Sequence, residues 1–205
     1  MTSLSVQTVP RPGDGQVCAM LATDIAGFSS PSRDDETRRH MRDQLYKMLR
    51  ESLEASGIPW EACRHEDQGD GVLVVIPPCI SASSMVDPFP MHLRTGIRRH
   101  NHVSSEAGKM QLRAAMHVGP VDIDAHGLVS TDVTYLFRML DARPLRKALD
   151  AAGTELVVAV SRWVHENIVL RHPSLADPTL FTPLRARVKR TSVCGWLYVP
   201  GKDHQ

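Results

Sequence analysis

Residues 17–29 of the 205-residue chain read VCAMLATDIAGFS and place a carboxylate, Asp24, at the end of an apolar run. The run is short and continuous, which predicts a buried strand over 17–22 that ends at Thr23 and Asp24. A small-residue turn with Gly27 follows, and its backbone N–H groups can approach and bind an anion. Residues 26–29 are therefore predicted to form a phosphate cradle, although Asp24 taken alone also suits a simple turn former.

A second carboxylate, Asp70, lies in the turn Gly69-Asp70-Gly71 between two extended segments, residues 64–68 and 72–76. An Asp-Gly turn between such segments predicts a hairpin, whose strands are expected beside the first strand. Asp24 and Asp70 would then face each other, and each would raise the other's pKa unless a cation neutralised them. Hard divalent cations bind one or two carboxylates together with phosphate oxygens. The pair therefore predicts one divalent-metal site that handles a nucleoside triphosphate. A plain turn residue is the alternative for Asp70.

Hydrophobic periodicity and turn residues predict the remaining elements. In chain order they are a helix that begins at Ser32 and stops at Gly57, a helix over 91–102, a strand over 112–118 ended by Gly119 and Pro120, a hairpin broken at Gly127, a helix over 131–149, a strand over 156–160, a short helix over 163–169, and paired strands at 186–189 and 196–199. Helices alternate with strands, but the hairpins make part of the sheet antiparallel. This order predicts an α+β fold, a ferredoxin-like βαββαβ sandwich with a C-terminal hairpin.

Composition is that of a soluble globular protein, because 42% of the residues are hydrophobic and 23% are charged. The length suits one domain, predicted over 17–200, after a disordered leader over 1–16 and before a tail over 201–205. A formal net charge of +1 gives no global attraction to nucleic acid or anionic lipid, so neither is an expected partner. No apolar stretch reaches membrane-spanning length, and the leader lacks the apolar core of a signal peptide. A cytoplasmic location is therefore expected.

In their order and spacing these motifs resemble the catalytic domain of class III nucleotide cyclases, over about residues 17–199. The first metal motif of that family, Asp-Ile-x-Gly-Phe-Ser/Thr, is matched by residues 24–29, and the second, Gly-Asp-Gly before an apolar strand, by residues 69–76. Residues 112–121 resemble the central strand that usually ends His-x-Gly. Residues 133–140 resemble the Val-Asn-x-Ala-x-Arg-Leu helix, and residues 188–199 resemble the terminal hairpin with its phosphate-binding lysine.

The resemblance implies conversion of a nucleoside triphosphate to a 3′,5′-cyclic nucleotide and pyrophosphate, with two Mn²⁺ or Mg²⁺ ions per site. Asp24 and Asp70 would hold the ions, and the Ile25 carbonyl would complete one coordination shell. Arg138 would stabilise the transition state and Thr134 would hydrogen-bond the ribose. The residues implied to bind the triphosphate are Ala26, Gly27, Phe28, Ser29 and Lys189. Arg138 would come from a second subunit, so the resemblance also implies a head-to-tail homodimer with shared active sites.

Three positions depart from the family. Its helix asparagine is Thr134 here, its adenine-selecting lysine is Glu66, and the usual aspartate partner of that lysine falls near Gly127. The adenylate-specific pair is therefore absent, whereas Glu66 can accept hydrogen bonds from guanine or from the N3–H of uracil. The bare catalytic domain and the divergent base pocket resemble the pyrimidine cyclases of bacterial Pycsar antiphage systems. That likeness predicts UTP as the substrate and cyclic UMP as a second messenger. A guanylate or adenylate cyclase of bacterial signalling and an inactive nucleotide-binding homologue are the alternatives.

Overall fold

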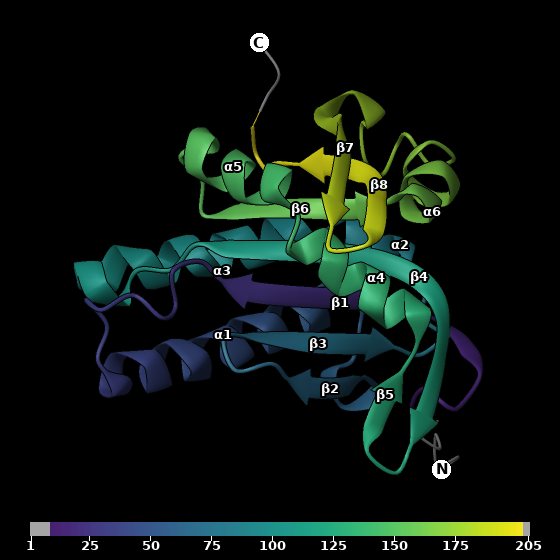
Figure 1. The fold of residues 1–205 in the computed structure, drawn as a ribbon, viewed down its shortest axis with the longest axis horizontal. Coiled ribbons are helices and arrows are strands. Elements are labelled where there is room, and N and C mark those ends of the chain that lie inside the picture. The colour runs from purple at the N-terminus through teal and green to yellow at the C-terminus, as the bar shows by residue number, and fades with distance from the viewer. Residues whose placement is uncertain (1–8, 203–205) are drawn as a thin grey trace, which may run out of the picture.

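One mixed sheet forms the centre of the computed structural model, which describes residues 9–202 (Figure 1). Its strands lie in the order β2-β3-β1-β4-β6-β8-β7, and β5 pairs with β4. The strand bounds are β1 Gln16–Ile25, β2 Arg64–Asp67, β3 Gly71–Ile76, β4 Leu112–Asp124, β5 Gly127–Val129, β6 Leu156–Ser161, β7 Phe181–Val188 and β8 Thr191–Tyr198. In the described part of the chain β4 and β6 pair in parallel and the other pairs are antiparallel. The predicted α+β class is confirmed.

Helices cover both faces of this sheet (Figure 1). Their bounds are α1 Asp35–Ala55, α2 Ser83–Val86, α3 Phe89–Val103, α4 Thr131–Leu140, α5 Arg143–Ala152 and α6 Arg162–Val164, with 3-10 turns η1 Trp60–Ala62, η2 Glu106–Gly108 and η4 Pro178–Leu180 and the π-helical turn η3 His165–Val169. The helices α1 and α3 pack on one face, and α4 and α5 pack on the other.

The alternation of side chains along β1 divides the core between the two faces. Leu21 and Ile25 pack on the α1 and α3 side, whereas Met20 and Ala22 pack on the α4 and α5 side. Burial on both faces explains why this strand is a continuous apolar run. Asp24 lies two residues after Ala22, so its carboxylate faces the same side of the sheet, the side that carries α4 and α5.

Two predicted helix boundaries are wrong. The helix predicted to begin at Ser32 begins at Asp35, because the Asp34 carboxylate accepts the Thr37 N–H at 2.8 Å and caps it there. The helix predicted over 131–149 is two helices, α4 and α5, separated at residues 141–142. Pro144 lies in the first turn of α5, where the missing N–H does no harm, whereas inside one long helix it would break the hydrogen-bond ladder.

The predicted end of the central strand at Gly119 and Pro120 is also wrong, because β4 continues through both residues to Asp124. Its pairing with β6 stops at Met116, while its pairing with β1 continues to Val121. Pro120 therefore lies where β4 has a strand on one side only, and a missing N–H is tolerated at such an edge. The hairpin predicted at Gly127 is confirmed as the β4–β5 pair.

The C-terminal hairpin is confirmed, but the bounds of its strands differ from the predicted ones. Val188 pairs with Thr191, and Trp196 pairs with Pro183, so the strands begin and end earlier than predicted. Lys189 lies in the two-residue turn with a φ of 53° and not in a strand. The lysine is exposed in this turn.

Residues 1–8 of the predicted leader and residues 203–205 of the predicted tail lie outside the described residues. The described part of the leader contacts the domain, because the Asp14 carboxylate accepts the Ile123 N–H at 2.7 Å and Arg11 donates to the Glu61 carbonyl at 3.3 Å. Within residues 9–202, none of the helices combines the length and the apolar character that a membrane crossing requires.

Candidate active site

Asp24 lies at the end of β1 with only 9% of its surface exposed. Arg113 on the neighbouring strand β4 binds both carboxylate oxygens, through Nε at 2.9 Å and a terminal nitrogen at 2.6 Å. Burial raises the pKa of Asp24 to about 6, Arg113 opposes this rise, and the charge of Asp70 adds to it. The site therefore holds a carboxylate that gains from any further positive charge. The sequence did not single out Arg113.

Asp70 is half-buried in the β2–β3 turn, and the backbone brings that turn against the end of β1. The Ile25 N–H donates to the Asp70 carbonyl at 2.9 Å, and Arg42 of α1 donates to the Gly69 carbonyl. A side chain at Gly71 would place its Cβ 1.8 Å from the Thr23 carbonyl oxygen, so only glycine fits this approach. The second glycine of the Gly-Asp-Gly pattern thus permits the turn with Asp70 to lie against the end of β1.

The donor set of this pair fits a magnesium or manganese ion. Each carboxylate oxygen has two lone pairs, and Arg113 occupies one on each oxygen of Asp24, so acceptor positions remain. The Ile25 carbonyl directly follows Asp24 in the chain, and the Phe28 N–H donates to it at 3.3 Å. No group of three or more metal-ligating side chains occurs within residues 9–202. The protein would therefore provide two carboxylates and leave the other positions to phosphate and water, as magnesium prefers.

The predicted cradle is an exposed turn with two unused N–H groups. Gly27 has a φ of 63°, which favours glycine. The Ala26 N–H donates to the Gln111 carbonyl at 2.9 Å and the Phe28 N–H to the Ile25 carbonyl, so these two are occupied. The N–H groups of Gly27 and Ser29 have no protein partner within the described chain. They are the donors that remain for an anion beside Asp24.

A second group of predicted residues lies on α4 and the β7–β8 turn. Thr134 is exposed and lines a cavity of about 490 Å³ together with Leu128 and Val129 of β5. Arg138 is half-buried in the last turn of α4, and Lys189 is exposed. Within residues 9–202 neither Arg138 nor Lys189 forms an ion pair. Both are thus free to bind phosphate.

The two predicted base-pocket residues lie together. A Cβ built on Gly127 would be 3.2 Å from Oε1 of Glu66, and the next residue, Leu128, donates its N–H to the same oxygen at 3.1 Å. Arg64 donates to Oε1 as well, from two nitrogens at 3.3 Å. Arg64 was not predicted, although its spacing of two from Glu66 on one strand places both side chains on the same face.

Solved structures of nucleotide cyclases have the same fold. An adenylate/guanylate cyclase/hydrolase from Silicibacter pomeroyi aligns with a TM-score of 0.61 and 20% identity, over 90% of this chain and 97% of that one. The guanylate cyclase domain of a rhodopsin-guanylyl cyclase from Catenaria anguillulae, solved with GTP, aligns with a TM-score of 0.61 and 13% identity, over 92% and 98%. No protein-family model matches the sequence. No curated protein matches it either.

The fold is that of a cyclase catalytic domain.

On this cyclase fold, the residues of the His-x-Gly pattern in β4 contact the first turn of α4 and hold the helix in place. Nε2 of His117 donates to the Asp132 carboxylate at 2.7 Å, and His117 is 7% exposed. A Cβ on Gly119 would lie 2.6 Å from the Asp132 carboxylate, so the glycine makes room for it. Ser130 caps α4 and donates to the Pro120 carbonyl at 2.6 Å. These contacts fix the helix that carries Thr134 and Arg138.

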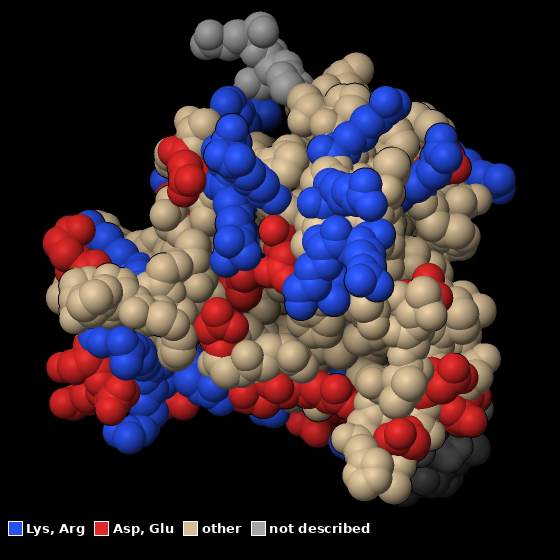
Figure 2. All heavy atoms as spheres, in the orientation of Figure 1, with Lys and Arg blue, Asp and Glu red and all other residues tan. Residues whose placement is uncertain are grey.

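Figure 2 shows the α4 face of the cyclase fold, with Lys and Arg side chains over α5 and the β7–β8 hairpin and Asp and Glu side chains in the hollow between them. The exposed basic residues of these elements are Arg143, Arg146, Lys147, Arg185, Arg187, Lys189 and Arg190. The charge of Arg146 lowers the pKa of Asp24, which places α5 within electrostatic reach of the carboxylates. Basic side chains on both sides of a group of acidic ones suit a polyphosphate bound with divalent cations.

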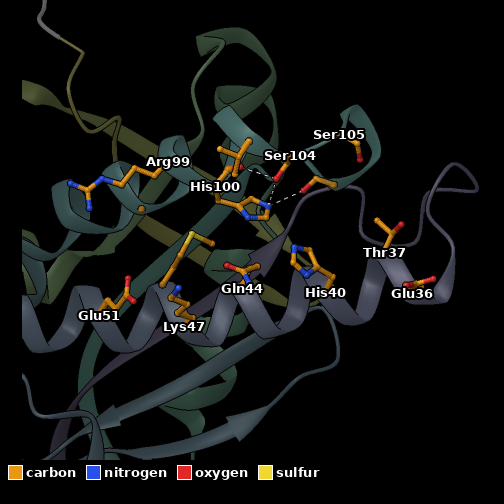
Figure 3. Close-up of a pocket in the computed structure, with 14 residues that line it drawn as sticks. Glu36, Thr37, His40, Gln44, Lys47, Glu51, Arg99, His100, Ser104 and Ser105 are labelled. Atoms are coloured by element: carbon orange, nitrogen blue, oxygen red, sulfur yellow. Dashed lines mark hydrogen bonds between the residues drawn. The ribbon is translucent and has the colours of Figure 1, made fainter.

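A larger cavity, of about 740 Å³, lies between α1 and α3 on the opposite face of the sheet (Figure 3). Its lining includes His40 and Lys47 of α1 and Arg99 and His100 of α3, and it contains neither Asp24 nor Asp70. The carboxylate pair and the α1–α3 cavity are therefore separate features of the fold.

Proposed function

We propose that the chain is a nucleotide cyclase that converts a nucleoside triphosphate to a 3′,5′-cyclic nucleotide and pyrophosphate. One observation carries the proposal: the turn with Asp70 lies against the end of β1, where the charge of Asp70 raises the pKa of Asp24, and the turn that follows β1 leaves the N–H groups of Gly27 and Ser29 without a protein partner in the described chain. A fold supports many activities, so the argument depends on this site and not on the fold alone.

Each residue of this half-site has a defined task. Asp24, Asp70 and the Ile25 carbonyl would hold two Mn²⁺ or Mg²⁺ ions, which when bound neutralise phosphate charge and acidify the ribose 3′-hydroxyl. The cradle at 26–29 would bind the β- and γ-phosphates, so that pyrophosphate is already held as it leaves. Arg113 keeps Asp24 oriented through both oxygens. Orientation of this kind supports an in-line attack on the α-phosphate.

The other half of the site would come from a second copy of the chain. Arg138 and Lys189 have no ion-pair partner among the described residues, and Thr134 opens into its own cavity. We propose a head-to-tail homodimer in which Arg138 stabilises the charge that develops on the α-phosphate, Lys189 binds the triphosphate and Thr134 bonds the ribose. Two such sites would form per dimer because the arrangement is symmetric.

The contacts of Glu66 leave one carboxylate oxygen for the base. Oε1 already accepts from Leu128 and Arg64, which uses its lone pairs, and no protein donor reaches Oε2 within the described chain. Oε2 can accept the single ring N–H of uracil, and the divergent base pocket, which resembles that of the pyrimidine cyclases, favours uracil over guanine. We therefore propose UTP as the substrate. A role for cyclic UMP as an antiphage second messenger of the Pycsar kind is proposed from the sequence resemblance.

A guanylate cyclase is the second candidate, because several solved structures of the same fold are guanylyl cyclases and one of them was solved with GTP. The deciding experiment incubates the protein with an equimolar mixture of the four nucleoside triphosphates and Mn²⁺ and measures cyclic products by mass spectrometry. Cyclic UMP as the main product is expected, and cyclic GMP would favour the second candidate. Pyrophosphate without any cyclic nucleotide, or no pyrophosphate at all, would contradict the cyclase function.

A further inference from the structure

Arg33 follows the cradle and joins it to the loop between α3 and β4. Its guanidinium donates to three backbone carbonyls: Ala26 at 3.1 Å, Ala107 at 3.2 Å and Lys109 at 3.0 Å. The first belongs to the cradle, and the other two lie in or next to η2, more than 70 residues further along the chain. The planar fork of arginine suits this task, because it fixes several acceptors at once.

The α3–β4 loop is a rigid support for this contact. Asn101 of α3 bonds the backbone of Met110 twice, accepting from its N–H at 2.7 Å and donating to its carbonyl at 2.8 Å. Nε2 of the buried His100 donates to the Gly108 carbonyl at 3.0 Å. Figure 3 shows His100 and Ser104 at this end of α3. Arg33 therefore connects an exposed turn to a loop that is already tied to a core helix.

The bond to Ala26 determines the direction of a cradle donor. The Ala26 carbonyl and the Gly27 N–H belong to one planar trans peptide, so they point in opposite directions. Arg33 holds the carbonyl toward the α3–β4 loop, and the Gly27 N–H is thereby directed to the other side, where it has no protein partner in the described chain. Within the described chain, the bond from Arg33 is the only hydrogen bond that this peptide forms.

We propose that Arg33 is a positioning residue for the triphosphate: it orients the Gly27 N–H toward the β- and γ-phosphates of the substrate. The inference rests on the proposed function of the cradle and deepens it. Without the guanidinium fork the Ala26–Gly27 peptide rotates, and the bound pyrophosphate group loses a charge-assisted hydrogen bond. Groups that bind elsewhere in the site, such as a nucleoside monophosphate held by the base pocket, keep their affinity.

The test measures binding, not turnover. Isothermal titration in the presence of Mg²⁺ gives the Kd of inorganic pyrophosphate and of UMP for the wild type, Arg33→Ala, Arg33→Lys and the control Arg39→Ala, an exposed α1 arginine without a hydrogen bond or ion pair in the described chain. Loss of one hydrogen bond to a charged group corresponds to about a tenfold to hundredfold rise in the pyrophosphate Kd. We expect that rise for Arg33→Ala and Arg33→Lys, with the UMP Kd within about twofold of the wild type. Arg39→Ala should bind both ligands like the wild type.

Two outcomes would overturn the proposal: unchanged pyrophosphate affinity in a folded Arg33 variant, or an equal loss for pyrophosphate and UMP, which indicates a general structural effect. If Arg33→Ala does not fold, Arg33→Lys decides, because it keeps the charge and the aliphatic stem but cannot span three carbonyls. A wild type that binds pyrophosphate yet forms no cyclic nucleotide contradicts the proposed function and leaves the role of Arg33 in place. A wild type that binds no pyrophosphate contradicts both.

Discussion

Replacing Arg113 with methionine removes the only charge bonded to Asp24 among the described residues while keeping an apolar side chain of similar length in the core. In the wild type the folded pKa of Asp24 is about 6 against a usual 3.8. The stability that Asp24 contributes is fully present below pH 3.8 and is lost as the pH rises through 6. The loss amounts to about 3 kcal/mol and then levels off.

Without Arg113, the pKa of Asp24 rises above 6, because the opposing charge and its hydrogen bonds are gone. The loss of stability therefore continues at pH values where it has already ended in the wild type. The free energy of unfolding of Arg113→Met should fall below that of the wild type by about 1.4 kcal/mol for each pH unit above 6. At pH 5 the two proteins should differ only by a constant packing contribution.

Urea denaturation at pH 5, 6, 7 and 8 in EDTA measures this difference without interference from bound metal. Asp24→Asn introduced into both proteins is the control, since it should abolish the pH-dependent part of the difference. A difference between Arg113→Met and the wild type that is the same at pH 5 and pH 8 would refute the reasoning.

Three further predictions concern the same site. Asp70→Ala should abolish pyrophosphate release. It should change the free energy of unfolding by no more than about 0.5 kcal/mol, because the side chain lies in a turn and forms no hydrogen bond or ion pair within the described chain. Retained activity would contradict the metal assignment. Gly119→Ala should destabilise the fold by about 1–3 kcal/mol in urea denaturation, because its Cβ meets the Asp132 carboxylate, and the cost should shrink in an Asp132→Ala background. Mixing inactive Asp24→Ala and Arg138→Ala chains should restore one intact site per heterodimer, and an inactive mixture would argue against sites shared between subunits.

The sequence predicted the elements of the sheet because their signals are local. A continuous apolar run, an Asp-Gly turn and glycine or proline breaks each depend on a few neighbouring residues. Errors occurred where the deciding contact came from elsewhere: β4 passes through Pro120 because its pairing with β6 stops at Met116 and leaves that edge unpaired. Pro144 is a local signal that residues 131–149 form two helices. It was not used in the prediction, because the apolar residues on both sides of it have helical spacing.

The candidate site shows the same division. Asp24 and Asp70 were singled out because their residue type and turn positions signal chemistry locally, whereas Glu66 was singled out through the family resemblance. Arg113, which binds Asp24, and Arg64, which binds Glu66, were missed, because an arginine within a regular element carries no local sign of its role. Arg33 was missed for the same reason: its three acceptors are backbone carbonyls, two of them far away in the chain.

By itself, the sequence determined that this chain has a buried strand ending in a carboxylate, a glycine-flanked second carboxylate and an alternating α+β order, because residue type and spacing fix these features locally. Only the tertiary structure decided that the turn with Asp70 lies against the end of β1, through the close approach that Gly71 permits, and that Arg113 and Arg33 bind Asp24 and the cradle. The physical reason is range: turns and strands depend on neighbours in the sequence, whereas the charge on Asp24 and the direction of the Gly27 N–H depend on side chains that only folding brings within hydrogen-bonding distance.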